Sequence, residues 1–147
     1  MLNIEDRLAI LEMIAQYSYT YDSQDADGFA RLFAEDGVFE VFAPAKGVAV
    51  LHLESRAAIH AWAAKSLEAR RMVFTSRHHQ SGTLFDKLTA DAAETRTMVL
   101  VTHQRLDDAS PHPTLTGVYK DLWRKTAEGW RFARRAAYVD RDLQLSV

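Results

Sequence analysis

The sequence predicts an α+β fold, in which N-terminal helices pack on a curved, mostly antiparallel sheet that closes into a cone-shaped barrel. Helical patterns fill the first half of the chain and long β-patterns fill the second, which is typical of α+β rather than of alternating βαβ units. The 147 residues, 48% of them hydrophobic, fit a single domain over 1–147 with one core. A twisted sheet that curls around helices is expected to enclose a pocket.

Three helices are expected. The first covers residues 3–22, with Asn3 as its N-cap. A shorter helix covers about 26–33, and the segment EDG at 35–37 is expected to end it. Ser55 has the residue type and position of the N-cap of the third helix.

The strands are expected mainly after the third helix. A short strand at 38–42 precedes it, and 43–53 is expected to be a loop or an irregular hairpin. Runs rich in Thr, Val and aromatic residues, separated by turn signals, then predict four long strands at 73–85, 93–106, 114–125 and 130–139.

Asp22 is the most informative residue of the first helix. At about 100° per residue, Asp22 falls on the same face as Ile4 and Leu11, a stripe expected to be buried. A buried carboxylate requires a hydrogen-bond donor or a cation. His78 and His103, each within a β-type run, are the candidate partners. Alternatively, Asp22 ends the helix and caps the next one.

Alternation along the strands leaves several orientations open. Period two places His78 and His103 on faces that can turn inward, although a β-bulge could exchange His78 with His79. Arg135 is either an inward cation among small apolar residues or an outward one beside Arg134. Each histidine could also serve only a structural hydrogen bond.

The residue types together favour general acid–base chemistry. The chain offers one acid, two histidines that can face inward, and several tyrosines, namely Tyr17, Tyr19, Tyr21, Tyr119 and Tyr138. An aspartate beside a histidine in a pocket can transfer a proton, and neighbouring hydroxyl groups can donate hydrogen bonds to a developing charge.

The composition disfavours other functions. The 18 basic and 20 acidic residues give a net charge of −2 without long runs of one sign, so neither nucleic acid nor a membrane is an expected partner. Cysteine is absent, and the motifs HExxH, GxGxxG, GxxxxGK[ST] and GxSxG do not occur, so no metal and no cofactor are expected. The first segment carries acids where a secretory signal carries basic residues, which favours a cytoplasmic protein.

Four segments resemble the SnoaL-like branch of the nuclear transport factor 2-like (NTF2-like) superfamily, whose fold is cystatin-like. They are IEDRLAILEMIAQYSYTYDSQDADGFARLFAEDGVFEV, SRHHQSGTLFD, VTHQRL and GVYKDLWRKTAEGWRFARR. Within this superfamily the chain is similar to the scytalone dehydratases and the hexachlorocyclohexane dehydrochlorinases. The superfamily also contains isomerases, cyclases, dioxygenase small subunits and binding domains.

The resemblance implies roles for individual residues. Asp22 corresponds to the family's catalytic aspartate and His78 to its partner histidine. His103 resembles the second pocket histidine of the dehydratases, and Tyr21 resembles the tyrosine that precedes their aspartate. Arg135 falls where the dehydrochlorinases place a pocket arginine.

The resemblance and the residues together predict a cofactor-independent lyase, most simply a dehydratase, that acts on a small cyclic or aromatic hydroxy compound. Asp22 would orient His78, which would remove a proton from carbon. Four further residues would stabilise the developing oxyanion or the departing oxygen: Tyr21, His103, Tyr119 and Arg135. Lys120 stands where the dehydratases carry an asparagine, so their substrate is not expected here.

Two alternatives remain open at this stage. In one, the chain is an isomerase or a polyketide-cyclase-like enzyme with Asp22 as the base. In the other, it is a non-catalytic module that binds a small ligand. The expected ligand is a small hydrophobic or aromatic-type molecule, and the outer face of the curved sheet favours a homodimer or a homotrimer.

Overall fold

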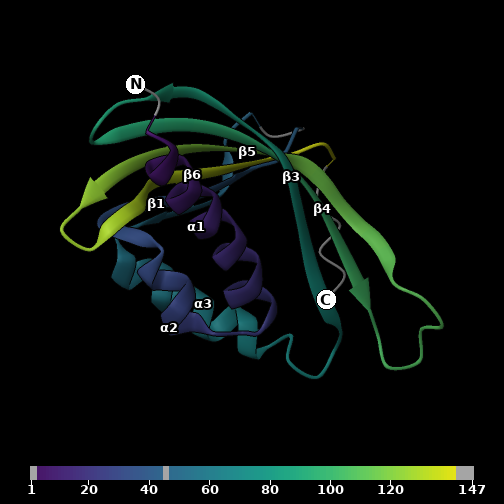
Figure 1. Ribbon diagram of the computed structural model, residues 1–147. Helices are drawn as coiled ribbons and strands as arrows, with labels where there is room; N and C mark the ends of the chain where they lie inside the picture. Colours follow the sequence, from purple (N-terminus) through teal and green to yellow (C-terminus); the bar gives the residue numbers. More distant parts are fainter. Residues whose placement is uncertain (1–2, 45–46, 142–147) are drawn as a thin grey trace.

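Three helices lie against one face of a six-stranded sheet in the computed structural model, which describes residues 3–44 and 47–141 (Figure 1). The helices are α1 (Ile4–Asp22), α2 (Ala26–Arg31) and α3 (Arg56–Glu68). The strands are β1 (Phe33–Phe42), β2 (Ala49–Glu54), β3 (Thr75–Leu88), β4 (Ala92–Gln104), β5 (His112–Thr126) and β6 (Gly129–Val139).

The strand order in the sheet is β2-β1-β6-β5-β4-β3, so β3 lies at one edge. Four of the five neighbouring pairs are antiparallel, and β1 and β6 are parallel. The sheet curves around the helices (Figure 1). The predicted α+β class and its mostly antiparallel sheet are therefore confirmed.

The buried face of α1 differs from the predicted one. Its buried apolar residues are Ile10, Ile14 and Tyr17, spaced by four and three residues. Ile4 and Leu8, on the stripe expected to be buried, are 67% and 60% exposed. The predicted stripe was wrong because the concave surface of the sheet receives the opposite side of the helix.

The segment 33–42 also differs from the prediction. α2 ends at Arg31, and β1 continues through the segment EDG that was expected to be a break. The pairing of β1 with β6 shifts in register between Phe33 and Val38, and this shift accommodates the segment EDG within the strand. Gly37 is required there, since an added Cβ would lie 2.9 Å from the carbonyl oxygen of Ala34. The following segment is a hairpin, because β2 pairs with β1.

A β-bulge in β6 determines which arginine faces the core. Leu122 of β5 pairs with Arg134, whereas Trp123 pairs with Phe132, so one extra residue lies between the two β6 positions. The bulge shifts the alternation by one residue. As a result Arg135 is completely buried, while Arg134 is only partly buried.

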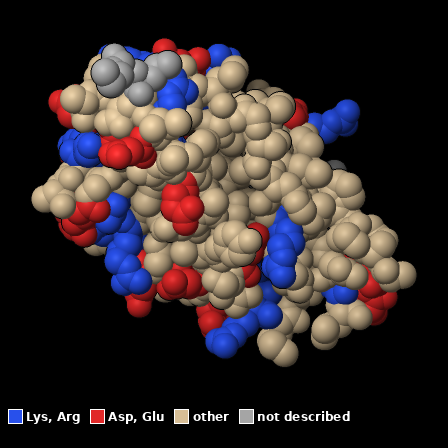
Figure 2. All heavy atoms as spheres, in the orientation of Figure 1, with Lys and Arg blue, Asp and Glu red and all other residues tan. Residues whose placement is uncertain are grey.

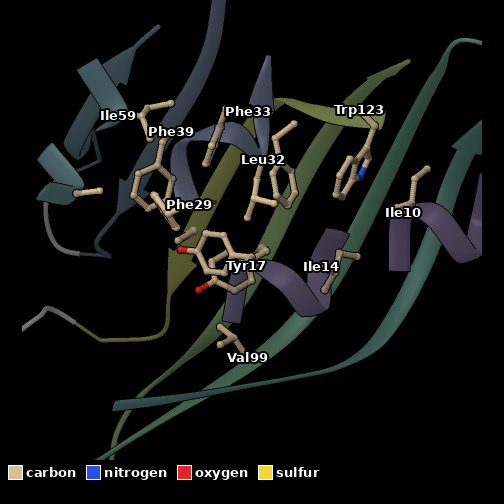
Figure 3. Close-up of a cluster of buried hydrophobic side chains, with 14 of the residues drawn as sticks. Ile10, Ile14, Tyr17, Phe29, Leu32, Phe33, Phe39, Ile59, Val99 and Trp123 are labelled. Atoms are coloured by element: carbon tan, nitrogen blue, oxygen red, sulfur yellow. The ribbon is translucent and has the colours of Figure 1, made fainter. Parts of the chain in front are cut away.

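The core is rich in aromatic side chains from helices and strands. Tyr17 of α1 lies in its middle, near Phe29 of α2 and Phe39 of β1 (Figure 3). Trp123 of β5 packs against Phe132 of β6 with 4.0 Å between the ring centroids and the rings tilted by 32°. This cluster fixes the position of α1 on the sheet, and therefore the position of the residues in its last turn.

Charged groups of both signs alternate on the face of the molecule shown in Figure 2, with uncharged surface between them. No described helix combines the length and the apolar character that crossing a membrane requires.

Candidate active site

The carboxylate of Asp22 contacts His78 at two points. Oδ1 lies 2.7 Å from the ring nitrogen Nδ1, and Oδ2 accepts a hydrogen bond of 2.8 Å from the backbone N–H of His78. The side chains of Asp22 and His78 are 9% and 8% exposed. Because a carboxylate accepts this hydrogen bond, Nδ1 carries the proton and Nε2 is the basic nitrogen. Nε2 makes no hydrogen bond with the described residues.

Packing between the last turns of α1 and the edge strand β3 creates this contact. Ser18 and Asp22 lie one helical turn apart, and Gln80 and His78 lie two residues apart on one face of β3. The Gln80 side chain donates to Ser18 Oγ at 2.8 Å and to the carbonyl oxygen of Ile14 at 2.9 Å. The predicted contact between Asp22 and an imidazole is therefore present, although the helix face that predicted it is exposed.

The second histidine of the HH pair points away from the dyad. His79 is exposed, and its Nε2 lies 3.2 Å from Thr102 Oγ1 of β4. No bulge exchanges the two histidines at this point, because His78 and His79 pair in order with Val101 and Leu100. The alternation of β3 is thus preserved through the dyad.

Tyr21 lies against the dyad. Its ring centroid is 4.4 Å from that of His78, and its hydroxyl accepts a hydrogen bond from Nη1 of Arg70. Burial raises the pKa of Tyr21, and Arg70 opposes that effect. Tyr21 therefore keeps its proton at neutral pH and can donate it in a hydrogen bond.

His103 of β4 lies on the same side of the sheet as the dyad. Its ring stacks on Phe74 with 3.9 Å between the centroids, and its Cα pairs with that of Ser76 on β3. Burial, Arg70 and His78 together lower the pKa of His103. This histidine is therefore neutral at pH 7, with one N–H donor and one acceptor.

Tyr119 and Arg135 lie deeper, next to Tyr17. The guanidinium carbon of Arg135 is 4.1 Å from the ring centroid of Tyr17 and 3.8 Å from that of Tyr119. The Tyr17 ring lies 6.0 Å from the ring of His78. Burial raises the pKa of Tyr119 to about 12. Tyr119 and Arg135 therefore lie behind Tyr17 as seen from the dyad.

Arg135 is held by a buried network. Its Nε donates to Oδ1 of Asp121 at 3.0 Å, and its Nη2 donates to Oε1 of Gln80 at 2.6 Å. Its Nη1 is buried and has no partner among the described residues. Burial raises the pKa of Asp121 to about 6, against the opposing effect of Arg135. Gln80 thus links this buried ion pair to α1.

Sequence reasoning missed three members of the site: Arg70, Gln80 and Asp121. Asp121 had a detectable signal, because it shares the alternating face of Tyr119, whereas Lys120 lies on the outer face over the ring of Tyr138. Arg70 lies in the turn after α3, where no periodicity applies. Among the described residues, no group of three His, Asp or Glu side chains could hold a metal ion.

A groove of about 540 Å³ lies beside the dyad, between α1 and β3. Its lining includes Ser18, Tyr19 and His78. Tyr21 and His103 are not among the residues that line it.

Comparison with known proteins gives the same fold. The model of the SnoaL-like domain matches residues 3–136. Rv3472 from Mycobacterium tuberculosis, a protein of unknown function, is 29% identical, with a TM-score of 0.75 over 92% of this chain and 72% of that one. A proposed scytalone dehydratase from Novosphingobium aromaticivorans is 27% identical, with a TM-score of 0.77 over 99% and 91%.

An NTF2-like protein with a cystatin-like fold, also from Novosphingobium aromaticivorans, is 27% identical, with a TM-score of 0.74 over 93% of this chain and 83% of that one. The predicted NTF2-like, cystatin-like fold is therefore confirmed. The comparison with curated proteins found no match.

Proposed function

The chain belongs to the SnoaL-like domain family, and from this premise we propose that it is a cofactor-independent lyase, most simply a dehydratase of small cyclic or aromatic hydroxy compounds. The observation that carries the proposal is the two-point contact between Asp22 and His78. The similarity to a proposed scytalone dehydratase supports the same reaction class.

His78 is the base in this proposal. Its Nε2 removes a proton from a carbon next to the carbon that bears the hydroxyl group. Asp22 keeps the proton on Nδ1 and stabilises the imidazolium that forms. The electron pair of the broken C–H bond forms a C=C bond as the C–O bond breaks. The hydroxyl oxygen leaves as water, after it takes a proton from the imidazolium or from a neighbouring donor.

Tyr21 and His103 assist the departing oxygen. Tyr21 is protonated at neutral pH and lies against His78, so its hydroxyl group is a suitable donor. His103 is neutral at the same pH and can offer an N–H. Donors that are already positioned stabilise developing charge without reorganisation.

Arg135 and Tyr119 act in this proposal through Tyr17, because both lie behind its ring. Arg135 is a fixed positive charge in a buried environment, where charge acts more strongly than in water. These two residues are therefore positioning residues, which hold Tyr17 and the wall of the site.

The test uses a panel of small cyclic hydroxy ketones and hydroxylated aromatic precursors, with product masses measured for each compound. Loss of water supports the lyase, whereas conversion at unchanged mass would assign an isomerase or a cyclase instead. With a turned-over compound in hand, His78→Ala and Asp22→Asn should each reduce kcat by about 100-fold or more. Losses below about threefold in both folded variants would exclude the dyad as the catalyst.

A non-catalytic module predicts a third outcome. The panel compounds would then bind without conversion, and the two dyad variants would bind them as tightly as the natural chain. Isothermal titration calorimetry on the same panel separates this outcome from catalysis.

A further inference from the structure

Arg70 is a half-buried cation beside the dyad that has no acidic partner among the described residues. Its one side-chain hydrogen bond is the one from Nη1 to the Tyr21 hydroxyl group. The remaining guanidinium N–H groups make no hydrogen bond with described residues. The nearest acid of the site, Asp22, uses both oxygens on His78. Within the described part of the chain, Arg70 therefore brings positive charge to the site without a paired acid.

Some other partly or fully buried arginines of the chain, unlike Arg70, pair with an acid. Arg135 pairs with Asp121, and Arg134 pairs with Glu40. Arg7 and Arg131 also have no acidic partner among the residues that the structure describes, but they lie elsewhere: Arg7 packs over the ring of Phe85, and Arg131 donates to the carbonyl oxygen of Trp130.

The backbone fixes the position of Arg70. Its N–H donates to the carbonyl oxygen of Leu67 at 3.1 Å, and its own carbonyl oxygen accepts from the N–H of Val73 at 3.0 Å. The turn that follows α3 therefore presents Arg70 toward Tyr21. Its neighbour Arg71 is exposed and pairs with Glu68.

Two further polar groups on the dyad's side of the sheet have no side-chain partner among the described residues. The hydroxyl group of Ser76 is buried and makes no hydrogen bond within that part of the chain, and Ser76 lies on the same face of β3 as His78. Directly across the sheet, His103 makes no side-chain hydrogen bond with the described residues. Arg70 is close enough to His103 to lower its pKa. A buried hydroxyl group without a partner in the chain is free to donate a hydrogen bond to a bound group.

We propose that Arg70, with Ser76, binds a carboxylate of the substrate. The substrates would then be cyclic or aromatic hydroxy acids. This inference specifies the substrate class of the proposed function, and it rests on that function only for the hydroxyl group of the substrate. The planar guanidinium can bind both carboxylate oxygens at once, and a carboxylate would also accept a hydrogen bond from the hydroxyl group of Ser76. The carboxylate orients the ring, and the dyad acts on its C–H bond.

The experiment compares benzoate with its neutral counterpart benzamide by isothermal titration calorimetry. The natural chain is expected to bind benzoate more tightly than benzamide. Arg70→Gln should weaken benzoate by about 10-fold or more, the effect of losing a charged hydrogen bond, and should leave benzamide unchanged. Arg70→Lys keeps the charge and loses the planar guanidinium, so its affinity for benzoate should lie between those of the natural chain and Arg70→Gln.

Arg71→Gln is the matched control, because it removes the same charge from the same turn and should leave benzoate binding unchanged. Thermal unfolding of each variant verifies that it is folded, and Arg70→Lys carries the test if Arg70→Gln does not fold. Equal binding of benzoate by the natural chain and Arg70→Gln would overturn the proposal. Equal affinity for benzoate and benzamide, or binding of neither, would overturn it as well.

The result is independent of catalysis. Benzoate has no hydroxyl group to eliminate, so its binding is measured without turnover. If the Asp22 and His78 variants left turnover unchanged, the proposed lyase mechanism would be excluded, and the benzoate result would still hold. If benzoate binding did not depend on Arg70, the carboxylate site would fail and the dyad mechanism would not be affected.

Discussion

Asp22 holds both the ring and the backbone of His78, with Oδ1 at 2.7 Å from Nδ1 and Oδ2 at 2.8 Å from the backbone nitrogen. Both contacts require an acceptor on residue 22. An asparagine there offers one acceptor and one donor, so it can keep only one of them. The aspartate therefore fixes the ring of His78 in two ways, through its tautomer and through its place on β3.

Asp6 should stabilise the fold in a pH-dependent way. It is bound by Lys125 Nζ at 2.8 Å and by Trp130 Nε1 at 2.7 Å, and the hydrogen bond from Lys125 is the main reason that its pKa is lowered from 3.8. A lowered carboxyl pKa stabilises the folded state above the unfolded value, and this contribution is lost as pH falls through the folded pKa. Asp6→Asn should therefore be less stable than the natural chain at about pH 7.

Urea unfolding at about pH 7 and about pH 2.5 checks this prediction. The difference between Asp6→Asn and the natural chain should shrink at the lower pH. Asp107→Asn, at an exposed position, should differ little from the natural chain at either pH. A difference that stays constant across the two pH values would contradict the role given to the Asp6 charge.

Arg135 should be a large contributor to stability, and its removal should make stability more sensitive to pH. Breaking a buried ion pair leaves Asp121 uncompensated, at a cost of about 3–5 kcal/mol. Without Arg135, the main effect that opposes burial is lost, and the pKa of Asp121 rises further above about 6. A raised carboxyl pKa favours folding at low pH, and this contribution is lost as pH rises through the folded pKa.

Arg135→Met should therefore lose more stability relative to the natural chain at about pH 8 than at about pH 5. Denaturant unfolding at both pH values measures the difference. Arg96→Met removes an arginine from the half-exposed pair with Asp86 and should cost roughly 0–1 kcal/mol. A similarly small loss in Arg135→Met would mean that the buried pair does not stabilise the fold.

His103 should titrate below its ordinary pKa of 6.5, since burial, the Arg70 cation and the neighbouring His78 disfavour its charged form. NMR titration of the ring protons measures the midpoint. Arg70→Gln should move that midpoint upward because it removes this cation, whereas Arg71→Gln should not move it. A midpoint at or above 6.5 in the natural chain would place His103 in a different environment from the one described.

Much of the fold followed from patterns along the chain. The strands after α3 were predictable because turn signals separate runs of β-type residues, and the caps Asn3 and Ser55 indicated where two helices begin. The course of β1 was not predictable, because the sheet pairing with β6 keeps the segment EDG in a strand despite its turn-forming residues.

The site was predictable in part, and partly for the wrong reason. Asp22 does contact His78, but because the last turn of α1 lies against β3 and not because the stripe with Ile4 is buried. The inward position of Arg135 depends on the bulge in β6, which simple alternation does not reveal. Arg70 lies in a turn that is distant in sequence from α1, so only the folded chain brings it to Tyr21.

The most direct test of the account is a double-mutant cycle on the dyad, with kcat measured on a compound that the natural chain dehydrates. His78→Gln and Asp22→Asn should each lower kcat by about 100-fold or more, and the double variant should fall little below His78→Gln, because Asp22 acts through the ring that is already lost. Independent, multiplying losses, or losses below about threefold in both single variants, would contradict the claim that the two residues form one proton-transfer unit.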